Sequence, residues 1–195
     1  MNDQSRFRRG MRGMFSLLGA CAIGAALILP AAAQSSNSSV TQEIRGGGLY
    51  ASIAAASMTP VNYSNLANES TGVLNLSVSD ATGSSAGWNV AVSSSDFVYQ
   101  GSSPSGVNIP NTDFSITTAE NPVLVAGQPI DATGGPYAGA VAGTSLDNAR
   151  KTIAANAGFG SGDYSQALDV HLDIPARSQT GSYIATLTVL ITSGP

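Results

Sequence analysis

The chain has 195 residues and a formal net charge of −4, and only 10% of its residues are charged. Beyond Arg12 the basic residues are few and scattered, which argues against nucleic acid and anionic membrane surfaces as partners. The length fits one domain with a substantial hydrophobic core.

Residues 1–33 have the layout of a secretory signal peptide. A basic cluster precedes an apolar run at residues 14–29, which is followed by Pro30 and three alanines. The run is shorter than the roughly 20 residues that span a bilayer, so we expect cleavage near Gln34 and no membrane span in the mature chain. This predicts a secreted protein, extracellular or associated with the cell surface. A lipoprotein site at Cys21 and a twin-arginine signal at Arg8 and Arg9 are minor alternatives.

The predicted mature chain is acidic and has no cysteine. Removal of residues 1–33 leaves four basic and eleven acidic residues, a net charge of −7. The single cysteine, Cys21, leaves with the signal peptide, which excludes disulfides and thiol catalysis. Stability must therefore come from core packing.

Residues 34–48 are predicted to form a flexible N-terminal segment. A polar tract at residues 34–39 is followed by a short β-capable piece, residues 40–44, and by three glycines at positions 46–48. The domain itself is predicted to occupy residues 49–195.

Apolar residues that alternate with polar ones predict several strands, at residues 49–53, 73–78, 88–92, 114–117 and, more weakly, 122–125. Trp88, Val90 and Val92 share one strand face, so we expect the indole to pack in the core rather than against a surface glycan. The repeated Asp-Ala-Thr-Gly at residues 80–83 and 131–134 is interpreted as turn chemistry and not as calcium loops.

One helix and one hairpin are predicted toward the C-terminus. Residues 146–155 are expected to be helical, with Ser145 as N-cap and Gly158 as a C-terminal stop. Residues 168–174 and 183–191 alternate strongly and are joined by a short loop, which predicts a β-hairpin. The predicted fold class is thus all-β: a single immunoglobulin-like antiparallel β-sandwich with one short helix in an inserted loop.

The candidate catalytic and metal-binding residues do not form a site. Asp169, His171 and Asp173 share a strand face, but neighbouring side chains there are about 6–7 Å apart, which favours a solvated face over a metal site. A glycosidase pair among Asp163, Asp169 and Asp173 is disfavoured, because Asp169 and Asp173 would lie about 13 Å apart. His171 is the only histidine, and no nucleophile motif accompanies it. We therefore predict no enzyme activity, no cofactor and no metal.

Several motifs, in order, resemble the WxL family of bacterial cell-surface domains. They are Gly87-Trp88-Asn89-Val90-Ala91-Val92, Leu172-Asp173-Ile174-Pro175-Ala176, Gly181-Ser182-Tyr183 and Ala185-Thr186-Leu187-Thr188-Val189. The likeness extends from about residue 49 to the end, and Gly87, Trp88, Val90, Tyr183, Leu187 and Val189 are the motif residues that we expect to be mainly structural. Two departures are Val90, where the family prefers Leu, and Val189, where a second Trp would be expected.

The resemblance implies a secreted β-sandwich that catalyses nothing and associates noncovalently with peptidoglycan or with other surface proteins. The predicted function is accordingly that of a cell-surface or extracellular-matrix protein. The alternative is a subunit of an extracellular filament, which would self-assemble by addition of the residue 40–44 segment to the sheet edge of a neighbour.

Overall fold

The computed structural model describes residues 41–195. The predicted signal peptide, with Cys21, Arg8 and Arg9, lies outside the described residues, as does the polar tract that follows it. Within the described part of the chain no helix is long and apolar enough to cross a membrane.

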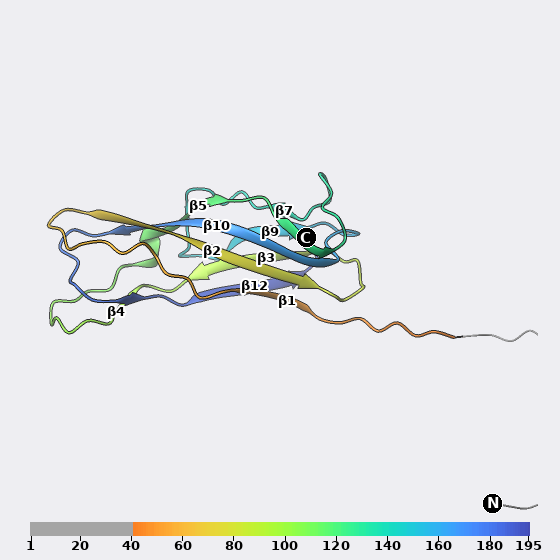
Figure 1. The fold of residues 1–195 in the computed structure, drawn as a ribbon, viewed down its shortest axis with the longest axis horizontal. Coiled ribbons are helices and arrows are strands. Elements are labelled where there is room, and N and C mark those ends of the chain that lie inside the picture. Colours follow the sequence, from red (N-terminus) through yellow and green to blue (C-terminus); the bar gives the residue numbers. More distant parts are fainter. Residues whose placement is uncertain (1–40) are drawn as a thin grey trace, which may run out of the picture. The chain divides into compact units, whose positions relative to one another are not determined.

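Two antiparallel sheets form a sandwich-like arrangement, which confirms the all-β prediction (Figure 1). The larger sheet has the order β1-β2-β10-β5-β8, and β6 also pairs with β10. Its strands are β1 (Leu49–Ile53), β2 (Asn68–Asp80), β10 (Gly162–Ile174), β5 (Phe114–Ala119), β6 (Val123–Gly127) and β8 (Thr144–Ser145). The long strands β2 and β10 run antiparallel along their whole length, with Leu168 opposite Leu74.

The smaller sheet has the order β12-β3-β9-β7. Its strands are β12 (Leu187–Ser193), β3 (Trp88–Ser94), β9 (Arg150–Ala155) and β7 (Tyr137–Ala138). A separate pair is formed by β4 (Val98–Tyr99) and β11 (Tyr183–Ile184), and the only helical element in residues 41–195 is the 3-10 turn η1 (Asn111–Asp113). The alternating apolar residues predicted from the sequence supply the buried faces of β2, β3 and β10.

The core consists of two clusters. One surrounds Trp88 and contains Leu76, Val78, Val90, Ile153, Ala155 and Tyr164. The other includes Leu74, Phe97, Ile109, Phe114, Leu168 and Leu172. Trp88 is fully buried, so its predicted core position is confirmed.

The predicted helix at residues 146–155 is wrong, because residues 150–155 form strand β9 between β3 and β7. Thr152, Ile153, Ala154 and Ala155 are all buried, so no exposed helix face exists for them. The residues taken as an N-cap instead stabilise a turn: the Ser145 hydroxyl donates to Asp147 Oδ1 at 2.7 Å, and so does the Arg150 guanidinium at 3.1 Å. Burial between two strands has overridden the local helix signals.

The predicted hairpin between residues 168–174 and 183–191 is also wrong. β10 is a central strand of the larger sheet, flanked by β2 on one side and by β5 and β6 on the other. It therefore has no free edge for β12, which pairs with β3 in the opposite sheet. The connection between them crosses from one sheet to the other and includes β11.

The N-terminal segment approaches the larger sheet through two backbone hydrogen bonds. The amide of Gly47 donates to the Ala81 carbonyl at 2.7 Å, and the amide of Ala81 donates to the Gly48 carbonyl at 3.1 Å. These bonds extend the β1–β2 pairing toward the N-terminus. The boundary between a flexible segment and the domain at residue 48 stays a prediction.

Candidate functional site

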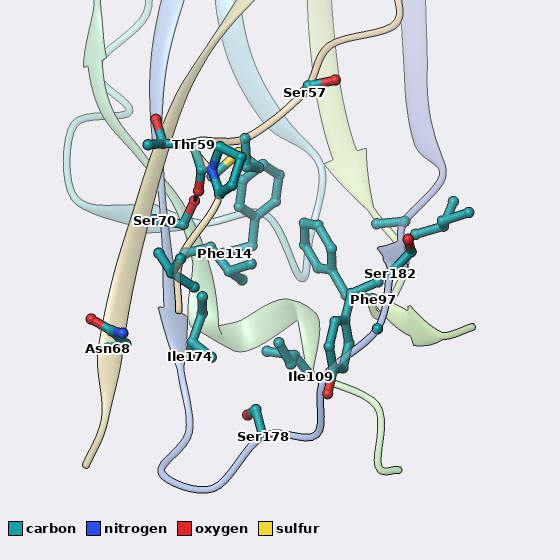
Figure 2. A pocket seen from close by; sticks show the side chains of 18 of the residues that line it. Ser57, Thr59, Asn68, Ser70, Phe97, Ile109, Phe114, Ile174, Ser178 and Ser182 are labelled. Atoms are coloured by element: carbon teal, nitrogen blue, oxygen red, sulfur yellow. Dashed lines mark hydrogen bonds between the residues drawn. The ribbon is translucent and has the colours of Figure 1, made fainter. Parts of the chain in front are cut away.

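A groove of about 910 Å³ opens at one end of the sandwich (Figure 2). Its volume lies within the range of about 300–1,000 Å³ that ligand sites occupy. Its walls come from the 54–66 loop, the first part of β2, the end of β10 with the loop that follows it, and the stretch from β11 to the start of β12.

The groove lies where the pairing of β1, an edge strand of the larger sheet, is interrupted, and where β11 gives way to β12, an edge strand of the smaller sheet. The pairing of β1 with β2 stops at Ile53 and resumes only at Thr59, whose amide donates to the Thr71 carbonyl at 2.8 Å. The Ser70 hydroxyl fixes this second contact by donating to the Thr59 carbonyl at 2.6 Å. On the opposite wall, β11 ends at Ile184 and β12 begins at Leu187. Residues between these contacts line the groove instead of completing a ladder.

Aromatic and aliphatic side chains make up the interior of the groove. The rings of Phe97 and Phe114 meet edge to face, with centroids 5.0 Å apart and an interplanar angle of 83°. Figure 2 shows these two rings and Ile109 between the side of Asn68 and Ile174 and the strand that carries Ser182. All three interior residues belong to a buried core cluster, so the groove is backed by rigid packing.

Polar but uncharged side chains surround this interior. The lining has no Asp, Glu, Lys, Arg or His among the described residues. It includes hydroxyl and amide groups from Ser57, Asn62, Ser64, Asn68, Ser178, Gln179, Thr180 and Ser182. Such a lining suits a neutral ligand that combines apolar surface with hydrogen-bonding groups.

Tyr183 is fixed at the groove wall. Its hydroxyl donates to the Gln179 carbonyl at 2.9 Å, and its ring lies 5.2 Å from that of Tyr99. Burial raises the pKa of the Tyr183 phenol, and the nearby Tyr99 adds to this effect. Tyr183 is therefore neutral at physiological pH, in keeping with the uncharged lining.

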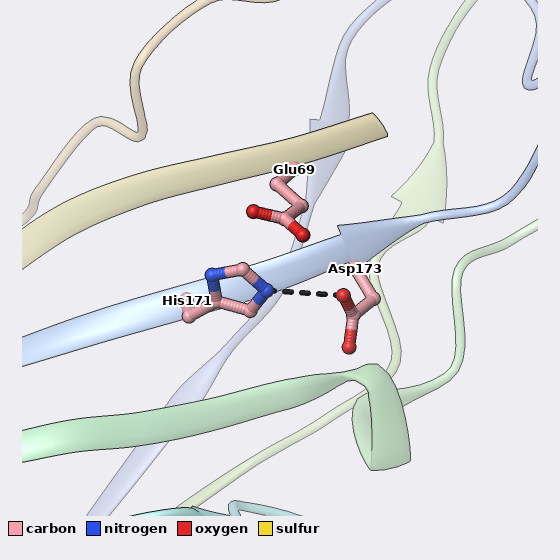
Figure 3. A group of neighbouring side chains, drawn as sticks. All are labelled: Glu69, His171 and Asp173. Carbon is pink, nitrogen blue, oxygen red and sulfur yellow. Dashed lines mark hydrogen bonds and ion pairs between the residues drawn. The ribbon is translucent and has the colours of Figure 1, made fainter. Parts of the chain in front are cut away.

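A second group of polar side chains lies on β2 and β10 and could offer cation ligands (Figure 3). His171 Nε2 is 3.0 Å from Asp173 Oδ1, and Glu69 lies opposite Asp173 in the strand register. Ligand atoms of the three residues all lie within 4.8 Å of one another. The structure thus brings His171 and Asp173 together with Glu69, whereas Asp169, which the sequence placed on the same strand face, is not part of the group.

This group does not make a strong metal site. Glu69 and Asp173 are exposed, and three protein ligands are one fewer than a structural zinc site uses. The hydrogen bond between His171 and Asp173 accounts for their approach. Sequence reasoning missed Glu69 because only the antiparallel pairing of β2 with β10 brings it near residues that follow it by more than a hundred positions.

The other predicted candidates lie away from the groove. Asp163, Asp169 and Asp173 follow one another along β10, and none of them lines the groove. Both Asp-Ala-Thr-Gly segments form the predicted turns: Asp80 Oδ1 accepts from the Thr82 amide at 2.9 Å, and Asp131 Oδ1 accepts from the amides of Thr133 and Gly134.

The six motif residues divide between the core and the groove. Gly87 directly precedes β3, and Trp88 and Val90 lie at its start, where the Trp88 indole donates to the Gly160 carbonyl at 2.8 Å. Val189, on β12, packs against the cluster that contains Trp88. Tyr183 and Leu187 line the groove. The motif residues thus include only two members of the concave site, and their role in function stays a prediction.

Most groove residues gave no signal in the sequence. The 54–66 loop is rich in Ala, Ser and Asn, which indicates a loop but no ligand. Phe97 and Ile109 are joined by an isolated bridge across a long Gly- and Ser-rich connection, so their proximity depends on tertiary structure.

The chain matches a known protein family over most of its length. The family model described as "WxL domain surface cell wall-binding" matches residues 35–195. The chain belongs to this family. The resemblance inferred from the motifs is thereby confirmed, and the family is one of cell-wall binding at the cell surface and not a known catalytic family. No curated protein and no solved structure matches the chain.

Proposed function

We propose that this WxL protein is a secreted, non-catalytic component of the cell surface that binds peptidoglycan noncovalently through the groove at the end of its sandwich. The observation that carries the proposal is an uncharged groove of about 910 Å³ in a chain whose family is cell-wall binding. The immunoglobulin-like arrangement of the strands and a role in an extracellular matrix belong to the same proposal. Other surface proteins are the alternative partners.

A sedimentation assay with isolated peptidoglycan tests this function. The mature chain should co-sediment with the wall material, and the Leu187→Asp variant should be depleted from the pellet, because a carboxylate would enter the apolar part of the groove. Thr188→Asp is the matched control, since Thr188 is exposed on the same strand and does not line the groove. Circular dichroism of both variants verifies that they are folded. Equal recovery of both folded variants in the pellet would place wall binding elsewhere.

Self-assembly by strand addition is the second candidate function. Ile44 has 92% of its surface exposed, so the segment before the glycines carries an apolar side chain outside the core. β1 and β12 are edge strands that could accept a strand from another copy. The hydrogen bonds of Gly47 and Gly48 to Ala81 limit how far such a segment could move from its own sheet. Sedimentation velocity at high protein concentration tests this candidate. If the wild type and the Ile44→Ser variant are both monomeric, self-assembly by strand addition is excluded.

A further inference from the structure

We infer that the groove takes the glycan part of the wall, an uncharged chain of N-acetylated sugars, and not the charged peptide part or an anionic wall polymer. This inference rests on the proposed function and specifies its ligand class. It follows from the charge, the ring surface and the hydrogen-bonding groups of the groove.

Charge is the first argument. Peptides of the wall carry free carboxylates and amines, and burying a charge without a partner costs far more free energy than burying an unpaired neutral polar group. The groove has no ionisable side chain apart from tyrosine among its described lining residues, so it could not compensate such charges. The acidic balance of the predicted mature chain, eleven acidic against four basic residues, also repels anionic polymers.

The exposed ring surface is the second argument. Tyr63 lines the groove and keeps 53% of its surface exposed, while Tyr183 is held in the opposite part of the lining by its bond to Gln179. Pyranose rings have one face made of C–H groups, which packs well against an aromatic ring. Tyrosine supplies such a face together with a hydroxyl at its wet end.

Free hydrogen-bonding groups are the third argument. Among the described residues, the side chains of Ser57, Asn62 and Ser182 line the groove and form no hydrogen bond with another protein group. They can therefore exchange water for sugar hydroxyl and acetamido groups without breaking an internal bond. Tyr63 makes only a long bond of 3.4 Å, to Asn65, so its hydroxyl is also adaptable.

The test measures binding of the mature chain to three probes by isothermal titration or sedimentation: intact peptidoglycan, a soluble uncharged oligomer of β-linked N-acetylglucosamine, and stem peptides released from the wall. We expect binding to the first two and none to the third. Tyr63→Ala should weaken oligomer binding by about five- to tenfold, the equivalent of one lost ring contact. The matched control is Tyr50→Ala, because Tyr50 is 68% exposed on β1 and does not line the groove.

A second variant introduces charge. Ser182→Glu should weaken oligomer binding by about fivefold, because a carboxylate at the groove would have to be desolvated by the ligand. Thr188→Glu, outside the groove, should leave binding unchanged. Binding of peptidoglycan without binding of the neutral oligomer, binding of stem peptides alone, or equal effects of Tyr63→Ala and Tyr50→Ala would each overturn the inference and leave wall binding intact. Absence of peptidoglycan binding by the wild type would instead overturn the proposed function.

Discussion

Replacing Trp88 with alanine should lower the free energy of unfolding by about 3–5 kcal/mol. The indole is fully buried, and its ring centroid lies 6.1 Å from that of Tyr164. Its N–H bonds the Gly160 carbonyl at 2.8 Å, and a Cβ at Gly160 would lie only 2.7 Å from the same nitrogen. The truncation therefore leaves a large cavity and an unsatisfied carbonyl. Trp88→Phe keeps a ring but loses the donor, so we expect a smaller loss of about 1–3 kcal/mol.

Thermal and urea unfolding followed by far-ultraviolet circular dichroism measures these losses. Fluorescence is unsuitable, because Trp88 is the only tryptophan. For a domain of this size about 1 kcal/mol corresponds to about 2–4 °C, so Trp88→Ala should lower the unfolding temperature by about 6–20 °C. Tyr50→Ala, at an exposed position, should stay within about 0.5 kcal/mol of wild type. A Trp88→Ala protein as stable as wild type but unable to bind peptidoglycan would refute the core role.

Three further outcomes concern pH, glycine positions and the N-terminal segment. Hydrogen bonds from the Gly134 amide, the Thr133 hydroxyl and the Thr133 amide hold the pKa of Asp131 below its ordinary 3.8, so its stabilisation is present above that pH and is lost as pH falls through the depressed pKa. Thermal melts between pH 5 and pH 2 should show a shallower fall in Asp131→Asn, and parallel falls would contradict this. In urea unfolding, Gly87→Ala should lower the free energy of unfolding by about 1–3 kcal/mol more than Gly83→Ala. Both glycines have a positive φ. Only at position 87 would the added Cβ meet a backbone atom, because it would lie 2.5 Å from the Ala155 carbonyl oxygen. Equal losses would show that the loop relaxes. Deleting residues 34–45 should leave a folded monomer of unchanged melting temperature, whereas deletion through residue 48 also removes the two bonds to Ala81 and should cost about 1–3 kcal/mol; an unfolded shorter deletion would contradict this.

The positions of β2, β3 and β10 could be predicted well from the sequence, because one face of each of these strands is buried. Trp88, Val90 and Val92 alternate with less buried residues along β3, and the same pattern identified β10. The spacing of two follows directly from strand geometry and needs no knowledge of the partner strand.

Pairing and the segment at residues 146–155 could not be predicted in the same way. Alternation indicates that a strand is half-buried, but it does not say which strand lies beside it, so β10 and β12 appeared to be a hairpin. The 146–155 segment has local helix signals, yet Ile153, Ala154 and Ala155 are all buried between neighbouring strands. Long-range packing determines both the pairing of β12 and the strand conformation of residues 150–155, and local sequence patterns carry no information about such packing.

The groove was beyond prediction because its parts are distant in sequence and mostly lie in loops. Met58, Phe97 and Tyr183 come from three separate connections or short strands and meet only in the folded chain. The motif that contains Trp88 lies in the buried core and not in the groove. Of the six motif residues, only Tyr183 and Leu187 line the groove.

The division of the family motif between core and groove bears on the missing second tryptophan. The resemblance places Val189 where a second Trp would be expected, and Val189 packs beside the cluster that contains Trp88, outside the groove lining. The two motif residues that line the groove are Tyr183 and Leu187. The valine therefore removes a ring from the packing between β12 and the core, where Leu49, Ala51 and Ile191 are also only partly buried. Under the proposed function this substitution affects the stability of an edge strand, and it leaves the ligand-binding surface intact.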